Sequence, residues 1–180
     1  DGRTGADDDK AATATFFNVP AFALYRNALI AHLRAQPLSL ADTTDLFADL
    51  DRATAEGMRQ TWRHKFTEGF WRPTAAITSD DADPLTDPVP DWTAVLPVPA
   101  YPDWPSGHGT LTGAFAETVR CHLGDIPLTL NGAGAPRTYT SLATLEHDAF
   151  MSRIWGGIHF RDAMDDGYLI GHTVARQACT

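Results

Sequence analysis

Three short segments carry side chains whose types and spacing could do chemistry. The first covers residues 65–73 (KFTEGFWRP), in which Lys65 and Arg72 are seven positions apart. Seven residues are about two helical turns, so both side chains lie on one face of a helix. Two cations on one face repel each other unless an anion lies between them. One interpretation is therefore an anion-binding pair, and the other is a solvated basic face with Glu68 as partner.

The second segment is Pro105-Ser106-Gly107-His108, directly before an apolar-periodic stretch. Ser106 occupies the position of a helix N-cap. Gly107 permits close approach to the backbone, and the free N–H groups of a helix N-terminus attract anions. His108 lies in the first turn, where the helix dipole should lower its pKa and suit it to proton transfer. The alternative is an ordinary capped helix with a surface histidine.

The third segment covers residues 152–159 (SRIWGGIH) and supplies Arg153 and His159. Their spacing of six would place them on different sides of one continuous helix. The glycine pair at 156–157 permits the chain to turn and bring both side chains to one point. The alternative is an arginine at a helix end and a histidine whose polar atoms are satisfied within the next helix.

Taken together, the three segments supply the parts of a binding site for a tetrahedral oxyanion. They contribute three cations, neutral donors at a helix start and two imidazoles, namely Lys65, Arg72, Arg153, Ser106, Gly107, His108 and His159. Lysine is rare in this chain, since arginine occurs twelve times and lysine only at positions 10 and 65. A compact ammonium at position 65, rather than a planar guanidinium, would fit one oxygen of such an anion.

Helices are the elements expected to position these residues. Apolar residues recur at helical spacing from Phe16 to the residue before Pro37. Ser39 can then cap a second helix that runs to about Trp71, where Arg72-Pro73 stops it. Further helices are expected at residues 107–123, about 141–155 and about 160–178.

The remaining segments fit no helix. The proline-rich stretch 78–105 predicts a long ordered loop, and residues 124–137 predict a Gly/Pro turn region. Residues 1–14 are small and acidic with no apolar period, which predicts a disordered, mobile tail. The sum is an all-α helical bundle with one long irregular excursion.

Length and composition exclude several classes of protein. The chain has 180 residues, of which 43% are hydrophobic and 21% charged, as in a single globular domain. Its net charge of −9 argues against a nucleic-acid-binding surface, and no apolar run is long enough to span a membrane. A soluble protein is therefore expected, with its compartment left open.

The cysteines and the first residue carry two further indications. Two cysteines, Cys121 and Cys179, are too few for a disulfide scaffold or a cysteine-based zinc module, and they can pair or stay free. The sequence has neither an initiator Met nor a signal-type apolar segment, which indicates a processed chain, a fragment or an engineered product.

The order K-x6-R-P, P-S-G-H and S-R-x5-H resembles the signature of the type 2 phosphatidic acid phosphatase superfamily, which includes vanadium-dependent haloperoxidases and bacterial acid phosphatases. The resemblance to bacterial vanadium haloperoxidases extends over roughly residues 38–178. It is carried by FWRPTAAI (70–77), DWTAVLPVPAYPDWPSGHGT (91–110), RTYTSLA (137–143) and SRIWGGIHFR (152–161). The third family motif ends H-x3-D, whereas Ala163 stands at that position here.

This resemblance implies an all-α helical bundle of the vanadium haloperoxidase type with a long Pro-rich loop. It implies a catalytic domain over residues 15–180. Because the haloperoxidases are longer, with further helices before this region, the domain is expected to be the C-terminal half of such an enzyme. Association with those N-terminal helices or into a homo-oligomer is an open expectation.

The resemblance also implies a vanadate cofactor, whose site phosphate can occupy. His159 would be the metal ligand, while Lys65, Arg72, Arg153, Ser106 and Gly107 would surround the oxyanion. His108 would act as acid–base and Lys65 would assist catalysis. The implied reaction is the oxidation of halide by hydrogen peroxide to hypohalous acid, which would act on a small organic substrate.

Two other functions use the same residues. In a phosphomonoesterase, His159 would attack phosphorus to form a phosphohistidine, and His108 would protonate the leaving alkoxide. In an inactive helical module, the cation cluster would bind an anion without turnover.

Overall fold

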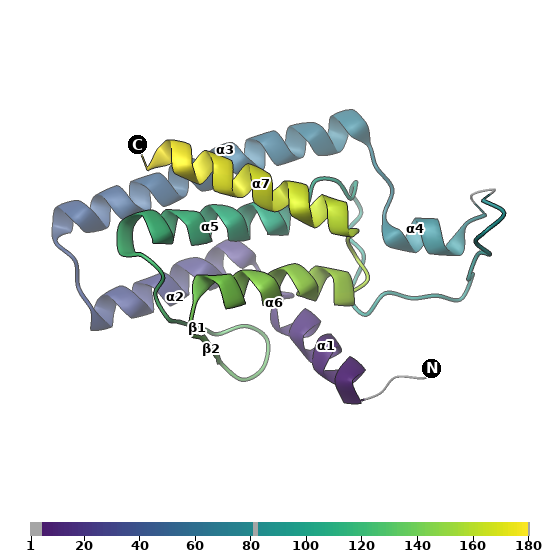
Figure 1. Ribbon diagram of the computed structural model, residues 1–180, viewed down its shortest axis with the longest axis horizontal. Coiled ribbons are helices and arrows are strands. Elements are labelled where there is room, and N and C mark those ends of the chain that lie inside the picture. Colours follow the sequence, from purple (N-terminus) through teal and green to yellow (C-terminus); the bar gives the residue numbers. More distant parts are fainter. Residues whose placement is uncertain (1–4, 81–82, 180) are drawn as a thin grey trace.

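The structure is a computed structural model that describes residues 5–80 and 83–179. Most of its regular structure is helical (Figure 1), which confirms the all-α prediction. The helices are α1 (Gly5–Phe16), α2 (Ala21–Ala35), α3 (Leu40–Glu68), α4 (Pro73–Thr78), α5 (Gly107–Leu123), α6 (Leu142–Trp155) and α7 (Arg161–Ala178). A short antiparallel hairpin of β1 (Leu128–Leu130) and β2 (Arg137–Tyr139) lies between α5 and α6.

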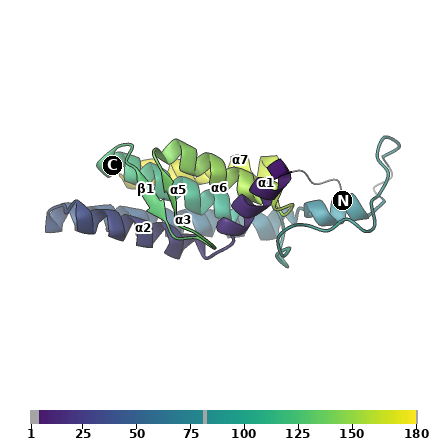
Figure 2. The ribbon, with the colours of Figure 1, turned by 90° about the horizontal axis from the view of Figure 1, so that it is seen from below.

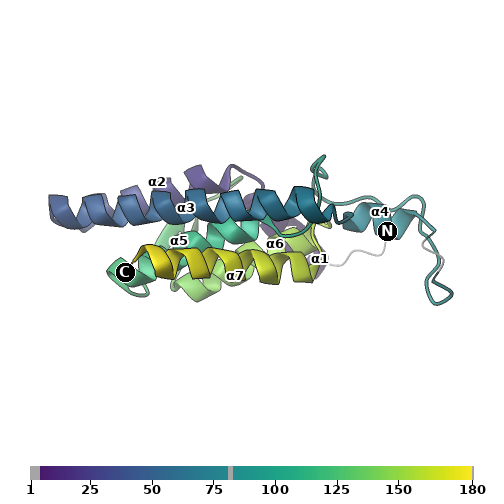
Figure 3. The same ribbon diagram turned by 90° about the horizontal axis from the view of Figure 1, so that it is seen from above.

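The longer helices form two layers. Figures 2 and 3 show α2 and α3 in one layer and α5, α6 and α7 in the other. The main core between them is built from aromatic and aliphatic side chains such as Phe17, Tyr25, Leu29, Phe115 and Leu142. Helix α4 and the irregular segment that follows it extend beyond one end of the bundle (Figure 1). Apart from Thr78, which ends α4, the described residues of the range 78–105 form no helix or strand, as predicted for a loop.

Helices α5 and α7 run parallel and touch through their backbones. A Cβ atom on Gly167 would lie 2.5 Å from the carbonyl oxygen of Ser106, and one on Gly171 would lie 2.4 Å from that of Thr110. Further along, Arg176 of α7 donates a hydrogen bond to Glu117 of α5 at 2.6 Å. The N-termini of both helices therefore lie at one end of the bundle and their C-termini at the other.

Helix α3 packs antiparallel to this pair. Ser39 caps it, as predicted, by accepting a hydrogen bond from the backbone N–H of Asp42. It ends at Glu68 rather than near Trp71 because Gly69 adopts the left-handed conformation (φ 65°) that terminates helices. The hydroxyl of Thr61 lies 2.7 Å from that of Thr110 on α5. The C-terminal end of α3 thus reaches the end of the bundle where α5 and α7 begin.

The predicted tail is wrong for residues 5–14, which form most of α1, while residues 1–4 lie outside the described residues. The helix packs on α6, and Ala14 and Phe16 are buried. Asp7 and Asp8 lie in its first turn, where negative charge complements the helix dipole. The helix predicted from Phe16 begins instead at Ala21, after an irregular turn.

The turn region predicted for 124–137 contains a strand that sequence patterning missed. Leu128 pairs with Tyr139 and Leu130 with Arg137, and both leucines are buried in the main core. Strands of three residues are too short to display an alternating pattern. Among the described residues, no helix combines the length and apolar character needed to cross a lipid bilayer.

The α5–α7 contact predicts that Gly171→Ala is destabilising. Alanine favours a helix interior over glycine by about 1 kcal/mol, but its methyl group would collide with the backbone of α5. We expect a net loss of about 1–3 kcal/mol in the free energy of unfolding, measured by chemical denaturation. Asp165→Ala, at an exposed position of the same helix, is the control and should be neutral or stabilising. Stabilisation by Gly171→Ala would contradict the close contact.

Candidate active site

The predicted site residues converge where α3 ends and α5 and α7 begin. Lys65 lies in the last turn of α3, Arg72 is the N-cap of α4 and Ser106 is the N-cap of α5. Arg153 lies in the last turn of α6, and His159 lies in the connection to α7. The side chains of Lys65, Arg72, Ser106, Arg153 and His159 are all buried. Between Arg153 and His159, Gly157 has a φ of 70° and turns the chain, as predicted for the glycine pair, whereas Gly156 keeps a helical conformation.

Lys65 holds the Pro-rich loop against the bundle. Its Nζ donates hydrogen bonds to the carbonyl oxygens of Pro102 at 2.8 Å and Asp103 at 2.7 Å. The side chain is only 1% exposed. Burial, aided by the positive charge of Arg72, lowers the pKa of Lys65 to about 7. An ammonium in this position lacks a full counter-charge, which a bound anion would supply.

Arg72 joins the loop to the connection between α6 and α7. Its Nε donates to the carbonyl oxygen of Tyr101 at 2.8 Å, and Nη1 donates to that of Ile158 at 2.6 Å. The ring of Tyr101 also lies 4.9 Å from the guanidinium carbon, within the range of a cation–π contact. Burial lowers the pKa of Arg72 as well. These contacts fix the planar guanidinium in one orientation.

Asp103 is a site residue that sequence reasoning missed. It is fully buried, and its Oδ1 lies 2.6 Å from Nδ1 of His159 and 3.7 Å from Nη1 of Arg72. A lone pair on Nδ1 would be repelled by a carboxylate at this distance, so we assign the proton to Nδ1. Nε2 of His159 then carries the free lone pair that a metal centre or an electrophile requires.

The carboxylate beside His159 therefore comes from an unexpected part of the chain. The family motif would place it four residues after the histidine, where Ala163 is buried and accepts a hydrogen bond from Ser106 N at 2.7 Å. Asp103 lies three residues before Ser106, on the Pro-rich loop. Burial lowers the pKa of His159 to about 4, and the contact with Asp103 opposes that shift. The imidazole is thus neutral near pH 7.

His108 and Arg153 present buried atoms that have no hydrogen-bond partner among the described residues. These atoms are Nε2 of His108 and Nε of Arg153. Burial, with the positive charge of Arg153 second, lowers the pKa of His108 well below its usual value. The predicted direction is correct, but desolvation is the main cause rather than the helix dipole. Oδ1 of Asp103 and Nδ1 of His159 also lack a partner in hydrogen-bond geometry, although they lie 2.6 Å apart. Buried polar atoms are rarely left unpaired, so a ligand beside His108 and Arg153 would satisfy atoms that the described residues leave free.

The start of α5 completes the site. The hydroxyl of Ser106 accepts a hydrogen bond from the N–H of Gly109 at 3.2 Å, which confirms the predicted N-cap. The N–H groups of Gly107 and His108 belong to the first turn, where an α-helix offers no carbonyl partner. The Ser106 hydroxyl retains its own proton as a donor. These groups and the helix dipole favour an anion at this end.

Phe17 closes the site from the side of α1. It follows α1, and its carbonyl oxygen accepts a hydrogen bond from Nη1 of Arg153 at 3.5 Å. Its ring stands edge-on to His108, with the centroids 6.4 Å apart. Phe17 falls within the apolar stretch that predicts a helix from Phe16, and nothing in that local pattern distinguishes a wall of a polar site from ordinary packing.

A cavity of about 860 Å³ borders the site. Its lining includes Asp103 and Ala163 together with the aromatic side chains of Phe70, Trp71, Trp104 and Phe160. The indole N–H of Trp104 donates to Asp166 at 2.7 Å. An apolar molecule in this cavity would lie next to the loop that carries Asp103.

The site has the charge required for an oxyanion. Three buried cations, Lys65, Arg72 and Arg153, are accompanied by the single carboxylate of Asp103 within the described site. Because unpaired buried charge is costly, a tetrahedral anion carrying two or three negative charges would be bound strongly. Charge alone would not distinguish vanadate from phosphate, since both are tetrahedral oxyanions.

Known proteins are similar to this chain in both sequence and fold. The family described as the VCPO second helical-bundle domain matches residues 45–180. Vanadium chloroperoxidase of Curvularia inaequalis is 33% identical over 88 residues, which cover 44% of this chain and 14% of that protein. The chain therefore spans only a small part of this curated relative.

Solved structures of similar proteins show the same fold. The structure of the first bacterial vanadium-dependent iodoperoxidase has a TM-score of 0.83 at 22% identity and covers 97% of this chain and 44% of its own. A holo-type bacterial vanadium-dependent chloroperoxidase has a TM-score of 0.73 at 17% identity, with coverage of 96% and 43%. At these identities the likeness establishes the fold alone.

The buried ammonium predicts a pH dependence of stability. Below about pH 7, Lys65 is charged in both the folded and the unfolded state, so folding includes the cost of desolvating the ammonium. Above that pH, Lys65 loses its proton in the folded state, whereas in the unfolded state it keeps the proton. The free energy of unfolding should therefore rise by about 1.5 kcal/mol between about pH 7 and about pH 8.5 in phosphate-free buffer. Lys65→Met should remove this rise, and Lys10→Met, at the other lysine, should retain it. An identical slope in both variants would contradict the assignment.

Proposed function

Because the chain belongs to the family of the VCPO second helical-bundle domain, we propose that its buried cation cluster binds vanadate. We propose further that the loaded site oxidises halide with hydrogen peroxide to hypohalous acid. The relatives whose names include vanadium are longer, and the chain spans 14% of the curated one and 44% of the iodoperoxidase. Because the chain spans only part of these relatives, the proposed haloperoxidase activity rests on the residues of the site and not on the relatives' names.

The observation that carries the proposal is the uncompensated positive charge of the site. Lys65, Arg72 and Arg153 are buried around one carboxylate, and Nε of Arg153 has no hydrogen-bond partner among the described residues. Vanadate, when bound, supplies a Lewis-acidic centre that binds peroxide and polarises its O–O bond. The three cations neutralise the oxyanion and fix its orientation before reaction, which is electrostatic preorganisation.

His159 is the residue that would hold the vanadium atom. Its Nε2 carries the free lone pair because Nδ1 faces Asp103 at 2.6 Å. Such a carboxylate orients a metal-binding histidine and increases its basicity. Asp103 also lies 3.7 Å from Arg72, so it fixes a ligand and a cation of the site at once. We assign it as a positioning residue for His159.

His108 is the residue that would move a proton. It is neutral near pH 7 because burial and the charge of Arg153 lower its pKa. A neutral imidazole can accept the proton that hydrogen peroxide gives up on binding, at Nε2, which lacks a partner among the described residues. A bound anion would offset the charge of Arg153 and make that acceptance easier.

The aromatic cavity beside Asp103 suits a small organic substrate. Phe70, Trp71 and Phe160 provide apolar walls at the edge of the site. Asp103 lines this cavity, so a molecule bound there would lie next to the carboxylate that contacts His159. The expected partners of the reaction are thus hydrogen peroxide, a halide and an apolar organic acceptor.

Halogenation of a phenol dye tests the proposed activity. We expect peroxide-dependent halogenation after addition of vanadate, and inhibition when phosphate competes for the same cations. Lys65→Met should lower turnover by at least about 100-fold, while Lys10→Met should match the parent chain. Hydrolysis of a phosphomonoester with no halogenation would assign the site to a phosphatase. Vanadate binding without either reaction would show that the chain is an anion-binding module without turnover.

Vanadate titrations of three variants separate the roles within the site. His159→Ala should abolish most of the vanadate affinity, and Asp103→Asn should weaken it by roughly 10–100-fold through loss of the orienting carboxylate. His108→Ala should retain much of the affinity while turnover falls by at least about 100-fold. His147→Ala, at an exposed histidine, is the control. Equal affinity in the His108 and His159 variants would show that their roles are wrongly assigned.

A further inference from the structure

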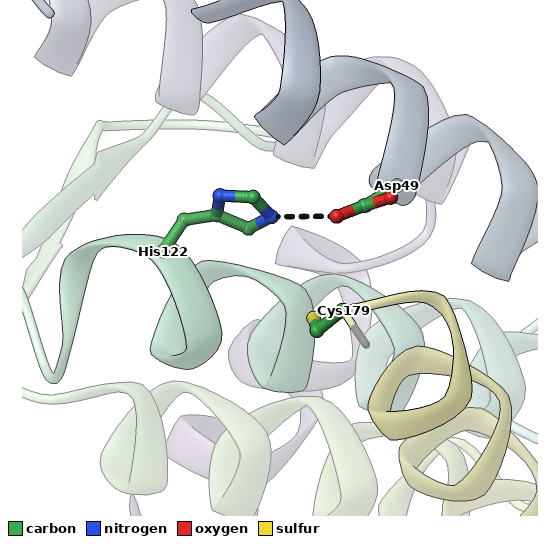
Figure 4. Close-up of side chains that lie close together, drawn as sticks. All are labelled: Asp49, His122 and Cys179. Atoms are coloured by element: carbon green, nitrogen blue, oxygen red, sulfur yellow. Dashed lines mark hydrogen bonds and ion pairs between the residues drawn. The ribbon is translucent and has the colours of Figure 1, made fainter. Parts of the chain in front are cut away.

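A second group of chemically competent side chains lies at the opposite end of the bundle. Asp49 of α3, His122 in the last turn of α5 and Cys179 at the C-terminus of α7 converge there (Figure 4). One ligand atom from each lies within 4.8 Å of the other two. Nε2 of His122 is 2.9 Å from Oδ2 of Asp49. The three residues are partly buried rather than fully solvated.

Cys179 supplies the sulfur ligand of this group. Its thiol is free, as is that of Cys121, which precedes His122 on α5 but is not one of the three grouped residues. Burial raises the pKa of the Cys179 thiol, so binding of a metal ion would release its proton. One sulfur atom, one imidazole nitrogen and one carboxylate oxygen therefore lie around a single point.

We propose that Asp49, His122 and Cys179 form a Zn²⁺ site with three protein ligands, in which a water molecule would complete the tetrahedron. Zinc binds thiolate, imidazole and carboxylate ligands at bond lengths of about 2.0–2.3 Å, which places neighbouring ligand atoms about 3.3–3.8 Å apart. The observed separations, from 2.9 Å to at most 4.8 Å among Asp49, His122 and Cys179, bracket that range. Small rotations of the side chains would therefore be sufficient to close the site.

The surroundings favour a cation at this end. The C-termini of α5 and α7 both point here, and the free carbonyl groups of helix C-termini attract positive charge. Asp49 divides its two oxygens, since Oδ1 accepts a hydrogen bond from Arg52 at 2.8 Å while Oδ2 faces His122. Arg52 would thus orient the carboxylate and leave the other oxygen for the metal, as outer partners of metal ligands do.

This site is distinct from the proposed vanadate site. Asp49 precedes Lys65 by sixteen residues of one helix, which corresponds to about 24 Å along α3. Similarly, His122 and His108 lie at opposite ends of α5. The two ends also differ in charge, because one has cations around a helix start and the other has a thiol, an imidazole and a carboxylate at helix ends. The zinc site would connect α3, α5 and α7, of which α3 carries Lys65 and α5 carries His108 at the other end of the bundle.

Cobalt binding tests the proposal directly. The reduced, metal-free chain is titrated with Co²⁺ and followed by absorbance. We expect one equivalent to produce a thiolate-to-cobalt charge-transfer band and the intense visible bands of tetrahedral cobalt, and Zn²⁺ to displace it. Cys179→Ser and His122→Gln should each weaken binding by at least about 100-fold, because loss of an outer partner alone costs roughly 10–100-fold. Zn²⁺ should also raise the melting temperature of the parent chain but not of Cys179→Ser.

Three controls make the outcome decisive. His147→Ala removes an exposed histidine and should bind Co²⁺ like the parent chain, as should His108→Ala and His159→Ala at the other end of the bundle. Circular dichroism verifies that each variant is folded. Absence of the thiolate band in the parent chain, or an unchanged band in Cys179→Ser, overturns the zinc site. Loss of both free thiols in air, with no metal uptake by the reduced chain, would assign the cysteines to a disulfide and also overturn it.

Discussion

The architecture depends on the direct backbone contact between two parallel helices. Gly167 and Gly171 bring α7 so close to α5 that a single methyl group would collide with the carbonyl oxygens of Ser106 and Thr110. Because the helices are parallel, both N-termini meet at one end and both C-termini at the other. The dipoles therefore add, which favours anions at the first end and cations at the second. Helix α3, packed antiparallel, contributes Lys65 to one end and Asp49 to the other.

At the first end of the bundle, the buried side chains carry more positive than negative charge. Lys65, Arg72 and Arg153 share one carboxylate, and the lowered pKa values of Lys65 and Arg153, about 7 and about 10, reflect the burial that this arrangement imposes. Such a site is unfavourable when empty of anion and favourable when it holds one, so stability and binding are linked. The carboxylate of Asp103 offsets part of this positive charge and orients His159.

The position of Asp103 shows how a chemical requirement can be met from a different part of the chain. A carboxylate beside the histidine is expected on the first turn of α7, yet Ala163 stands there and packs against Ser106 through its backbone. The long loop before α5 supplies the carboxylate instead, held by Lys65 and Arg72 through its carbonyl oxygens. The loop is therefore part of the site and not merely a connection, as is common for long irregular segments within one domain.

The sequence by itself predicted helices α2, α3, α5, α6 and α7, the Ser39 and Ser106 caps and the seven residues that meet at one end of the bundle, because caps, apolar periods and short motifs are local patterns. It did not predict α1, because this helix is recognisable only from its packing on α6. It also did not predict the hairpin, whose strands are too short to show a period. In the sequence, Asp103 could not be distinguished from the other acidic residues of the Pro-rich loop. Asp49, His122 and Cys179 are separated by up to 130 positions, so no local pattern connects them. Only tertiary structure decides such groups, since long-range packing, and not spacing along the chain, brings their atoms together.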